Sequence, residues 1–255
     1  MKNLPNFFTL LNLVFGCIAV IFILQNGIAI YSDPSTGTQL IDIPEKIWLA
    51  SLFIGLAALV DFLDGFVARL FKSTSAMGKE LDSLADLVSF GVAPGLIIYQ
   101  FLRLSYAQNE DGLNTSMIWL VPALLLPCAA AWRLAKFNLA TGTGYSFKGM
   151  PVPATGIFIA SLPLVYWNVN EAWAIKLLVN KWFLYGVIVL FSFLMVSTIP
   201  FISLKFKNYS VKDNLPKFLL IAMAIVSIVI FKWLAAPVII LAYVLVSLIF
   251  KNKLA

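Results

Sequence analysis

The chain has 255 residues, of which 61% are hydrophobic and only 12% are charged, so it lacks the polar side chains needed to cover a soluble protein of this size. The net charge is +6. In a membrane protein, basic residues in cytoplasmic loops next to anionic lipid explain such a charge, so no nucleic-acid partner is expected. The composition predicts an all-α, polytopic transmembrane helix bundle that forms a single integral-membrane domain over residues 1–255.

Eight apolar segments are predicted to cross the membrane as helices. They cover residues 5–25, 46–70, 80–102, 117–138, 152–169, 182–204, 216–231 and 233–250. Lys232 and Trp233 predict a tight turn between the last two segments, and without that turn the count falls to seven. The catalytic helices are expected within about residues 1–204, and the two helices over about 216–250 are expected to be additional.

The loop charges predict how the chain lies in the membrane. With eight spans, twelve basic residues fall in the loops and ends on one side, and five fall on the other. The basic side is predicted to be cytoplasmic, which places both termini there and requires an even number of spans. The expected location is therefore the cell membrane, in a multi-pass arrangement with the site described next on the cytoplasmic side.

Residues 61–86 (DFLDGFVARLFKSTSAMGKELDSLAD) place four aspartates at the junction of the second and third predicted helices. Asp61 and Asp64 are three residues apart, and Asp82 and Asp86 are four apart, so each pair lies on one helix face. Because the two helices run in opposite directions, the pairs are expected to meet at one depth.

Four carboxylates in a place of low dielectric repel one another unless cations neutralise them. The chain has no histidine, and Cys17 and Cys128 lie in apolar segments, so neither a zinc site nor a disulfide framework is expected. Oxygen-only ligands favour Mg²⁺ or Mn²⁺, with Ca²⁺ as a third candidate, and two such cations can clamp a phosphoryl group. Two alternatives are a salt-bridged interfacial loop and the ion pathway of a cation transporter, although the carboxylates gather at one end of their helices rather than across the bilayer.

The same stretch reads D-x-x-D-G-x-x-A-R and, after eight intervening residues, G-x-x-x-D-x-x-x-D. It resembles the signature of the CDP-alcohol phosphatidyltransferase family at every position. The resemblance implies a bundle of transmembrane helices, usually a homodimer, with a two-metal site, which transfers a phosphatidyl group from a CDP-linked lipid to an alcohol and releases CMP. It implies that the metals bind Asp61, Asp64, Asp82 and Asp86, with Asp86 also the general base. It further implies that the nucleotide and its pyrophosphate contact Asp61, Gly65, Ala68, Arg69, Gly78 and Asp82.

Five other segments resemble the bacterial and archaeal phosphatidylserine synthases of that family, over about the first 200 residues. They are PNFFTLLNLVFG (5–16), DSLADLVSFGVAPG (82–95), RLAKFN (133–138), KGMPVPATG (148–156) and MVSTIP (195–200). This resemblance implies CDP-diacylglycerol and L-serine as substrates.

A serine acceptor has a carboxylate to bind, and the basic pair in RLAKFN suits it. The predicted acceptor pocket comprises Asn12, Arg133, Lys136 and Asn138. Lys136 stands where the subgroup more often has arginine, which keeps the charge but loses a bidentate contact. Another acceptor, such as glycerol 3-phosphate or inositol phosphate, is the alternative within the family.

Overall fold

The computed structural model describes residues 4–32, 39–70, 75–108, 114–139, 147–202 and 211–251. The elements in chain order are α1 (Leu4–Gln25), β1 (Ala29–Ser32), β2 (Gln39–Asp42), η1 (Glu45–Ile47), α2 (Trp48–Leu70), α3 (Ala76–Asp86), η2 (Leu87–Val92), α4 (Ala93–Ala107), η4 (Met117–Trp119), η5 (Val121–Leu124), α5 (Leu125–Leu139), β3 (Phe147–Lys148), α6 (Val152–Asn168), α7 (Ala172–Leu178), α8 (Lys181–Val196), β4 (Pro200–Phe201), α9 (Val211–Phe231), η6 (Lys232–Leu234) and α10 (Ala235–Ile249).

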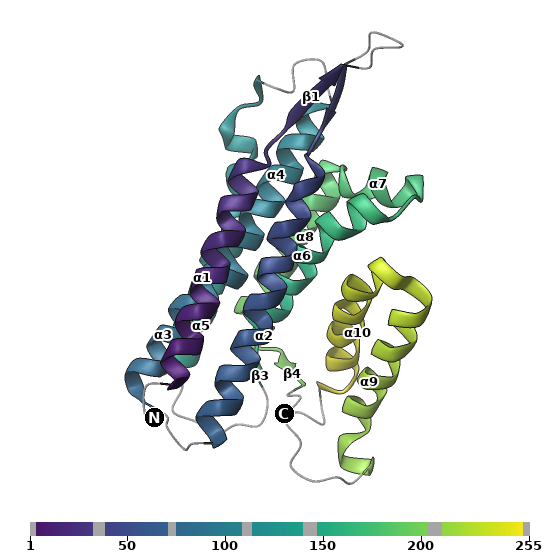
Figure 1. Cartoon of the computed structure of the whole chain (residues 1–255). Coiled ribbons are helices and arrows are strands. Elements are labelled where there is room, and N and C mark those ends of the chain that lie inside the picture. Colours follow the sequence, from purple (N-terminus) through teal and green to yellow (C-terminus); the bar gives the residue numbers. More distant parts are fainter. Residues whose placement is uncertain are drawn as a thin grey trace.

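The helices form an elongated bundle, through which a continuous helical run leads from α3, at its lower edge in Figure 1, to the largely buried α4. α1 packs along α2 and against this run, α5 pairs with α8, and α6 packs against α2 and α4. Ile97, Ile98 and Phe101 of α4 are fully buried. α1 approaches the run closely because Gly16 has no side chain: a Cβ there would overlap Ser89 Oγ.

The predicted helical membrane fold is confirmed, because each of the eight predicted segments contains a long helix. Within the described residues, four stretches are long and apolar enough to cross a membrane, or five if the bent pair α7–α8 counts as one. They are Asn6–Gln25, Glu45–Val67, Ala76–Ala107 and Asn214–Ile249. The last of these includes both α9 and α10, so the number of crossings stays a prediction.

The turn predicted at Lys232 is confirmed. Lys232 has φ of 46°, a conformation that interrupts a right-handed helix, and it is the first residue of η6. α9 and α10 consequently lie side by side as a hairpin, with α10 packed on α6 (Figure 1).

Several helix boundaries differ from the predicted ones, and α9 begins at Val211 rather than at residue 216. The third helical segment is longer than the predicted 80–102: it runs over Ala76–Ala107 and contains a π-helical turn over Leu87–Val92. The fourth segment begins with 3-10 turns around Pro122, and only Leu125–Leu139 is α-helical. The sixth ends at Val196 rather than at residue 204, because the following residues pair with the chain before α6.

An antiparallel pair of strands, β1 and β2, covers the end of the bundle opposite the α2–α3 connection (Figure 1). Tyr166 of α6 donates a 2.6 Å hydrogen bond to Asp42 Oδ1 and ties these strands to the helices. Strand pairing at this end was not predicted from the sequence.

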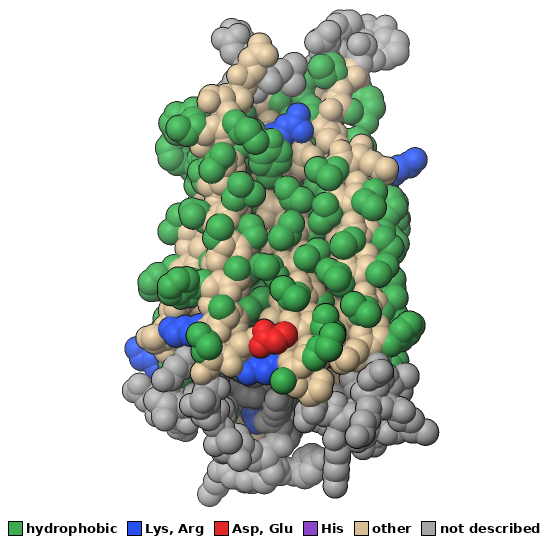
Figure 2. Space-filling model, turned by 90° about the vertical axis from the view of Figure 1, so that its left-hand side faces the viewer, with side chains coloured by type: hydrophobic (Ala, Val, Ile, Leu, Met, Phe, Trp, Pro, Cys, Tyr) green, Lys and Arg blue, Asp and Glu red, His purple; other side chains and the backbone are tan. Residues whose placement is uncertain are grey.

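The outer surface of the bundle is apolar. Figure 2 shows hydrophobic side chains over the middle of one face, with Lys and Arg side chains near its two ends. Leu24, Val189 and Val229 are 64%, 64% and 72% exposed. Exposing such side chains to water is unfavourable in free energy, whereas contact with lipid is not. The apolar helices and this surface identify an integral membrane protein.

Candidate active site

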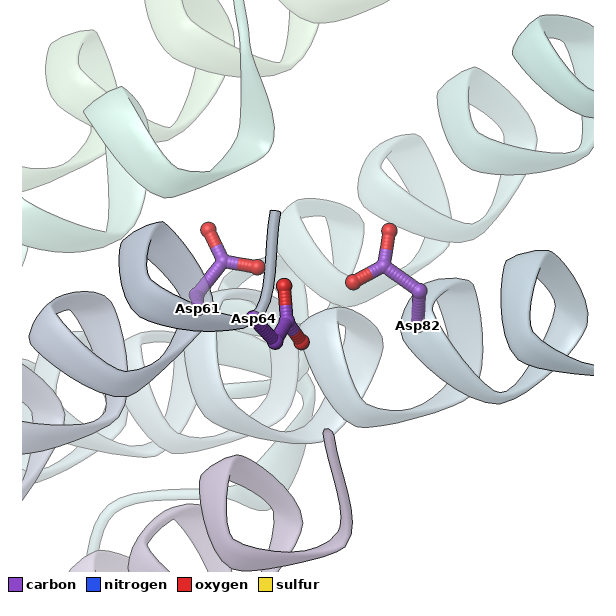
Figure 3. A group of neighbouring side chains, drawn as sticks. All are labelled: Asp61, Asp64 and Asp82. Atoms are coloured by element: carbon purple, nitrogen blue, oxygen red, sulfur yellow. The ribbon is translucent and has the colours of Figure 1, made fainter. Parts of the chain in front are cut away.

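Three carboxylates converge near one end of the bundle. Asp61 and Asp64 come from α2 and Asp82 from α3, and one oxygen of each lies within 4.8 Å of the others. Figure 3 shows the Asp61 and Asp82 carboxylates facing each other, with Asp64 beside them. The expected meeting of the two aspartate pairs from consecutive helices is confirmed for these three residues.

The start of α3 is fixed by local hydrogen bonding. Ser75 is the N-cap, and its Oγ accepts a 2.9 Å hydrogen bond from the Gly78 N–H. A Cβ at Gly78 would lie 3.0 Å from both Ser75 Oγ and Asn6 Oδ1, so this glycine allows the cap and α1 to come close to α3. The cap sets where Asp82 stands relative to α2, since Asp82 lies in the second turn.

α1 supplies polar partners for the carboxylates from within an apolar helix. Thr9 Oγ1 donates a 3.0 Å hydrogen bond to Asp64 Oδ2, and both residues are buried. Three residues later, Asn12 Nδ2 donates a 3.3 Å hydrogen bond to Asp86 Oδ1. α1 therefore holds one aspartate of each pair.

Asp86 is buried and lies outside the group of three carboxylates. It is the last residue of α3, and the π-helical turn begins directly after it. Ser89, in that turn, donates a 3.0 Å hydrogen bond to the main-chain oxygen of Asn12, so the turn and α1 are locked together beside Asp86. π turns within α-helices often mark functional sites. Asp61 interacts with both Asp82 and Asp86, which connects Asp86 to the group of three.

The donor set suits a hard divalent cation. It consists of carboxylate oxygens from two helices, which are ligands of Mg²⁺, Mn²⁺ and Ca²⁺. Among the described residues, no atom lies within 4 Å of where a Cβ at Gly65 would stand, so this part of the structure leaves open space next to Asp64. Ala68 and Arg69 lie in the last turn of α2, and their side chains lie outside the described part of the structure. Their predicted contacts with the nucleotide stay predictions.

Arg133 of α5 is a buried basic side chain within electrostatic range of Asp86. It is 8% exposed and interacts electrostatically with Asp86, and its guanidinium lies 5.5 Å from the centre of the Phe137 ring. Among the described residues, its Nε and the Oδ1 of Asn12 have no hydrogen-bond partner. The Oδ1 of Asn138, another residue of the predicted acceptor pocket, likewise has no partner there. Buried polar atoms are seldom left without partners, so these atoms are candidates for contacts with a polar ligand.

The other two residues of the predicted acceptor pocket, Asn138 and Lys136, have no described contact with Asp86. Asn138 Nδ2 donates to Ser83 Oγ at 2.9 Å and to Glu80 Oε2 at 3.2 Å, and Lys79 Nζ donates to the Asn138 main-chain oxygen. Asn138 thus joins α5 to the first half of α3. Lys136 is exposed. The structure therefore brings Asn12 and Arg133 to Asp86, whereas it gives Asn138 partners on the outer part of α3.

The sequence does not predict the bonds from Thr9 and Ser89, although both residues stand in segments that resemble the phosphatidylserine synthases. The signal for them was a polar side chain within an apolar helical segment, which is costly in a membrane unless the side chain finds a partner. Which partner each would find did not follow from that signal.

Comparison with known proteins gives a consistent result. The family model described as CDP-alcohol phosphatidyltransferase matches residues 2–194. A CDP-diacylglycerol–serine O-phosphatidyltransferase of Helicobacter pylori is 38% identical over 175 residues, which cover 68% of this chain and 67% of the relative. Enzymes of the same name from Mycobacterium bovis and Bacillus subtilis are 31% identical over 252 residues (95% of this chain, 76% of the relative) and 36% identical over 121 residues (48% and 63%).

Proposed function

Because this chain belongs to the CDP-alcohol phosphatidyltransferase family, we propose that it transfers the phosphatidyl group of CDP-diacylglycerol to the hydroxyl of L-serine, giving phosphatidylserine and CMP. The relatives that carry the serine transferase name support serine as the acceptor. The structural observation that carries the proposal is the convergence of three carboxylates next to a buried Asp86, with the buried Arg133 beside it.

Asp61, Asp64 and Asp82 would hold a divalent cation, and Asp86, together with Asp61, would complete a second site. Mg²⁺ and Mn²⁺ are the preferred candidates, with Ca²⁺ as the third. When bound, the cations would neutralise the pyrophosphate and stabilise the charge that develops on the leaving nucleotide.

The residues around the carboxylates would position the nucleotide. The open space at Gly65 admits the nucleotide head next to Asp64. Ala68, Arg69 and Gly78 complete this binding region, and the Arg69 charge complements the pyrophosphate. The acyl chains stay in the bilayer, because the apolar outer surface of the bundle leaves them in contact with lipid.

Asp86 would act as the general base and Arg133 as the ligand of the serine carboxylate. Asn12 orients the Asp86 carboxylate through its 3.3 Å hydrogen bond. Asp86 takes the proton of the serine hydroxyl, and the serine oxygen attacks the phosphorus that bears diacylglycerol. The bond from that phosphorus to the CMP oxygen breaks, and CMP leaves with the electron pair. Asn12 Oδ1 and Arg133 Nε, which lack partners among the described residues, are available to the serine ammonium and carboxylate respectively.

The protein would work as a multi-pass homodimer in the cell membrane, with both termini and the site on the cytoplasmic side. α1 begins and α10 ends at the same end of the bundle, which is also the end where α2 leads into α3 (Figure 1). This arrangement requires an even number of crossings, and it agrees with the concentration of basic residues in the loops on that side.

An acceptor assay on the detergent-purified protein tests the proposal. CDP-diacylglycerol and Mn²⁺ are supplied with serine, glycerol 3-phosphate or inositol phosphate, and CMP and the lipid product are measured. We expect CMP and phosphatidylserine with serine alone. If lipid product forms only with glycerol 3-phosphate, that compound is the acceptor and serine is not. If the protein conducts cations across liposome membranes and releases no CMP, it is a transporter and the proposed transferase activity is refuted.

A further inference from the structure

The second half of α5 lies against α3 and the π-helical turn in one antiparallel register. At one end of this contact, Asn138 Nδ2 donates a 2.9 Å hydrogen bond to Ser83 Oγ. At the other end, a Cβ at Gly91 would lie 3.0 Å from the Cβ of Ala130. Eight residues separate the two contacts on each chain, so the register is the same at both ends.

This register places Asp86 at the level of two neighbouring side chains of α5. Asp86 follows Ser83 by three residues and therefore lies at the level of position 135, midway between Arg133 and Phe137. Arg133 and Phe137 are four residues apart, so they lie on the same face of α5. Arg133 is buried, whereas Phe137, nearer the end of the helix, is 47% exposed.

The Phe137 ring contacts the Arg133 guanidinium directly. The central carbon of the guanidinium lies over the ring, 5.5 Å from the ring centre, which is within the range of a cation–π interaction. Side chains on a helix lean toward its N-terminus, so a ring at position 137 covers the turn that carries Arg133. Arg133 Nε lacks a hydrogen-bond partner among the described residues, which leaves the ring face to restrain the guanidinium.

The same ring is tied to α3. Lys79 Nζ lies over it, 5.7 Å from the ring centre, and donates a 2.9 Å hydrogen bond to the main-chain oxygen of Asn138, the next residue of α5. Asn138 in turn donates from its side chain to Ser83 and Glu80 of α3. The ring therefore relates Arg133 of α5 to the helix that supplies two of the aspartates.

We propose that Phe137 is a positioning residue for the acceptor: its ring holds the Arg133 guanidinium at the level of Asp86, where the guanidinium binds the acceptor carboxylate. The carboxylate and the hydroxyl of serine are only a few bonds apart, so their partners Arg133 and Asp86 must stay close together. A guanidinium that is restrained before serine binds loses less conformational freedom on binding. The inference rests on the proposed role of Arg133 in serine binding.

Steady-state kinetics of Phe137→Leu test it, because this change removes the ring face and keeps an apolar side chain. We expect the KM for serine to rise about fivefold, the effect of losing roughly one cation–π interaction. The kcat at saturating serine and the KM for CDP-diacylglycerol should stay within about twofold of the parent. Phe137→Tyr keeps the ring face, so its KM for serine should also lie within about twofold of the parent.

Trp132→Leu is the matched control, since it removes another exposed ring from α5 that takes part in none of the cation–ring contacts of the described residues. It should leave the KM for serine unchanged. An unchanged serine KM in Phe137→Leu, or an equal rise in Trp132→Leu or in Phe137→Tyr, would overturn the inference. If Phe137→Leu does not yield folded protein, Phe137→Met decides in the same assay: it fills the space without a ring face, and an unchanged serine KM would again overturn the inference.

The parent protein separates this inference from the function on which it rests. Absence of serine-dependent CMP release by the parent refutes the proposed function and needs no variant.

Discussion

Replacing Asn12 by leucine measures how much one hydrogen bond to Asp86 contributes to the reaction. Asn12 is fully buried, and its Nδ2 is the described hydrogen-bond donor to Asp86 Oδ1. Leucine has a similar size and favours the helix, and the bond from Ser89 to the Asn12 main-chain oxygen does not depend on the side chain. The substitution removes the orienting bond and, with Oδ1, the proposed contact to the serine ammonium, so kcat is measured at saturating serine.

The expected loss follows from the type and length of that bond. A hydrogen bond to a charged group contributes about 1.5–3 kcal/mol, and each 1.36 kcal/mol corresponds to about tenfold in rate. The N–O distance of 3.3 Å is longer than the usual range for such bonds, so the lower end of the interval applies. We expect kcat for serine-dependent CMP release to fall about tenfold.

A double-mutant cycle shows whether Asn12 acts through Asp86. If it does, Asn12→Leu should cause no further loss in a protein that already carries Asp86→Asn. Asn26→Leu is the control for stability, because Asn26 is a buried asparagine at the other end of α1 and bonds only to the Phe22 oxygen among the described residues. A kcat within twofold of the parent for Asn12→Leu, or fully additive losses in the cycle, would refute the reasoning.

Four further predictions concern the site and the topology. Asp86→Asn should bind CDP-diacylglycerol but lose CMP release by at least about 10²-fold, and restoration by saturating Mn²⁺ would show that Asp86 only holds metal. EDTA should abolish CMP release and Mg²⁺ or Mn²⁺ should restore it, whereas full activity in metal-free buffer would contradict a metal site. Gly65→Leu should leave the melting temperature unchanged, because the side chain enters open space, yet raise the KM for CDP-diacylglycerol at least about tenfold by filling that space; an unchanged KM would place the nucleotide elsewhere. With Cys17 and Cys128 replaced, a cysteine at position 37 should be labelled from outside intact cells and one at position 208 should not, and the reverse pattern would invert the topology.

The helical segments could be predicted because a membrane allows few alternatives. In lipid every main-chain polar group needs an internal partner, so a long apolar run becomes a helix. The pairing of Asp61 with Asp64 followed from helical spacing, and their meeting with Asp82 followed from the short connection between two antiparallel helices. Likewise, Lys232 between two apolar runs predicted the turn that separates α9 from α10.

The place of Asp86 beside the group of three aspartates could not be predicted in the same way. Spacing treats Asp82 and Asp86 alike, whereas in the structure Asp86 ends α3 at a π-helical turn and bonds to Asn12, 74 positions away in the chain. The early end of α8 and the pairing of β3 with β4 likewise depend on main-chain partners distant in sequence. Local propensity contains no information about such partners.

The sequence by itself determined the class of protein, its apolar helical segments and the set of carboxylate, amide and guanidinium groups near one end of them. These follow from composition and from helical periodicity, which are local properties. Only the tertiary structure decided that Asn12 and Arg133, rather than Lys136, accompany Asp86, and that Tyr243 of α10 bonds to the main chain at Ile202. The physical reason is that a buried polar group must find a partner wherever packing brings one within reach, and packing depends on the whole bundle at once.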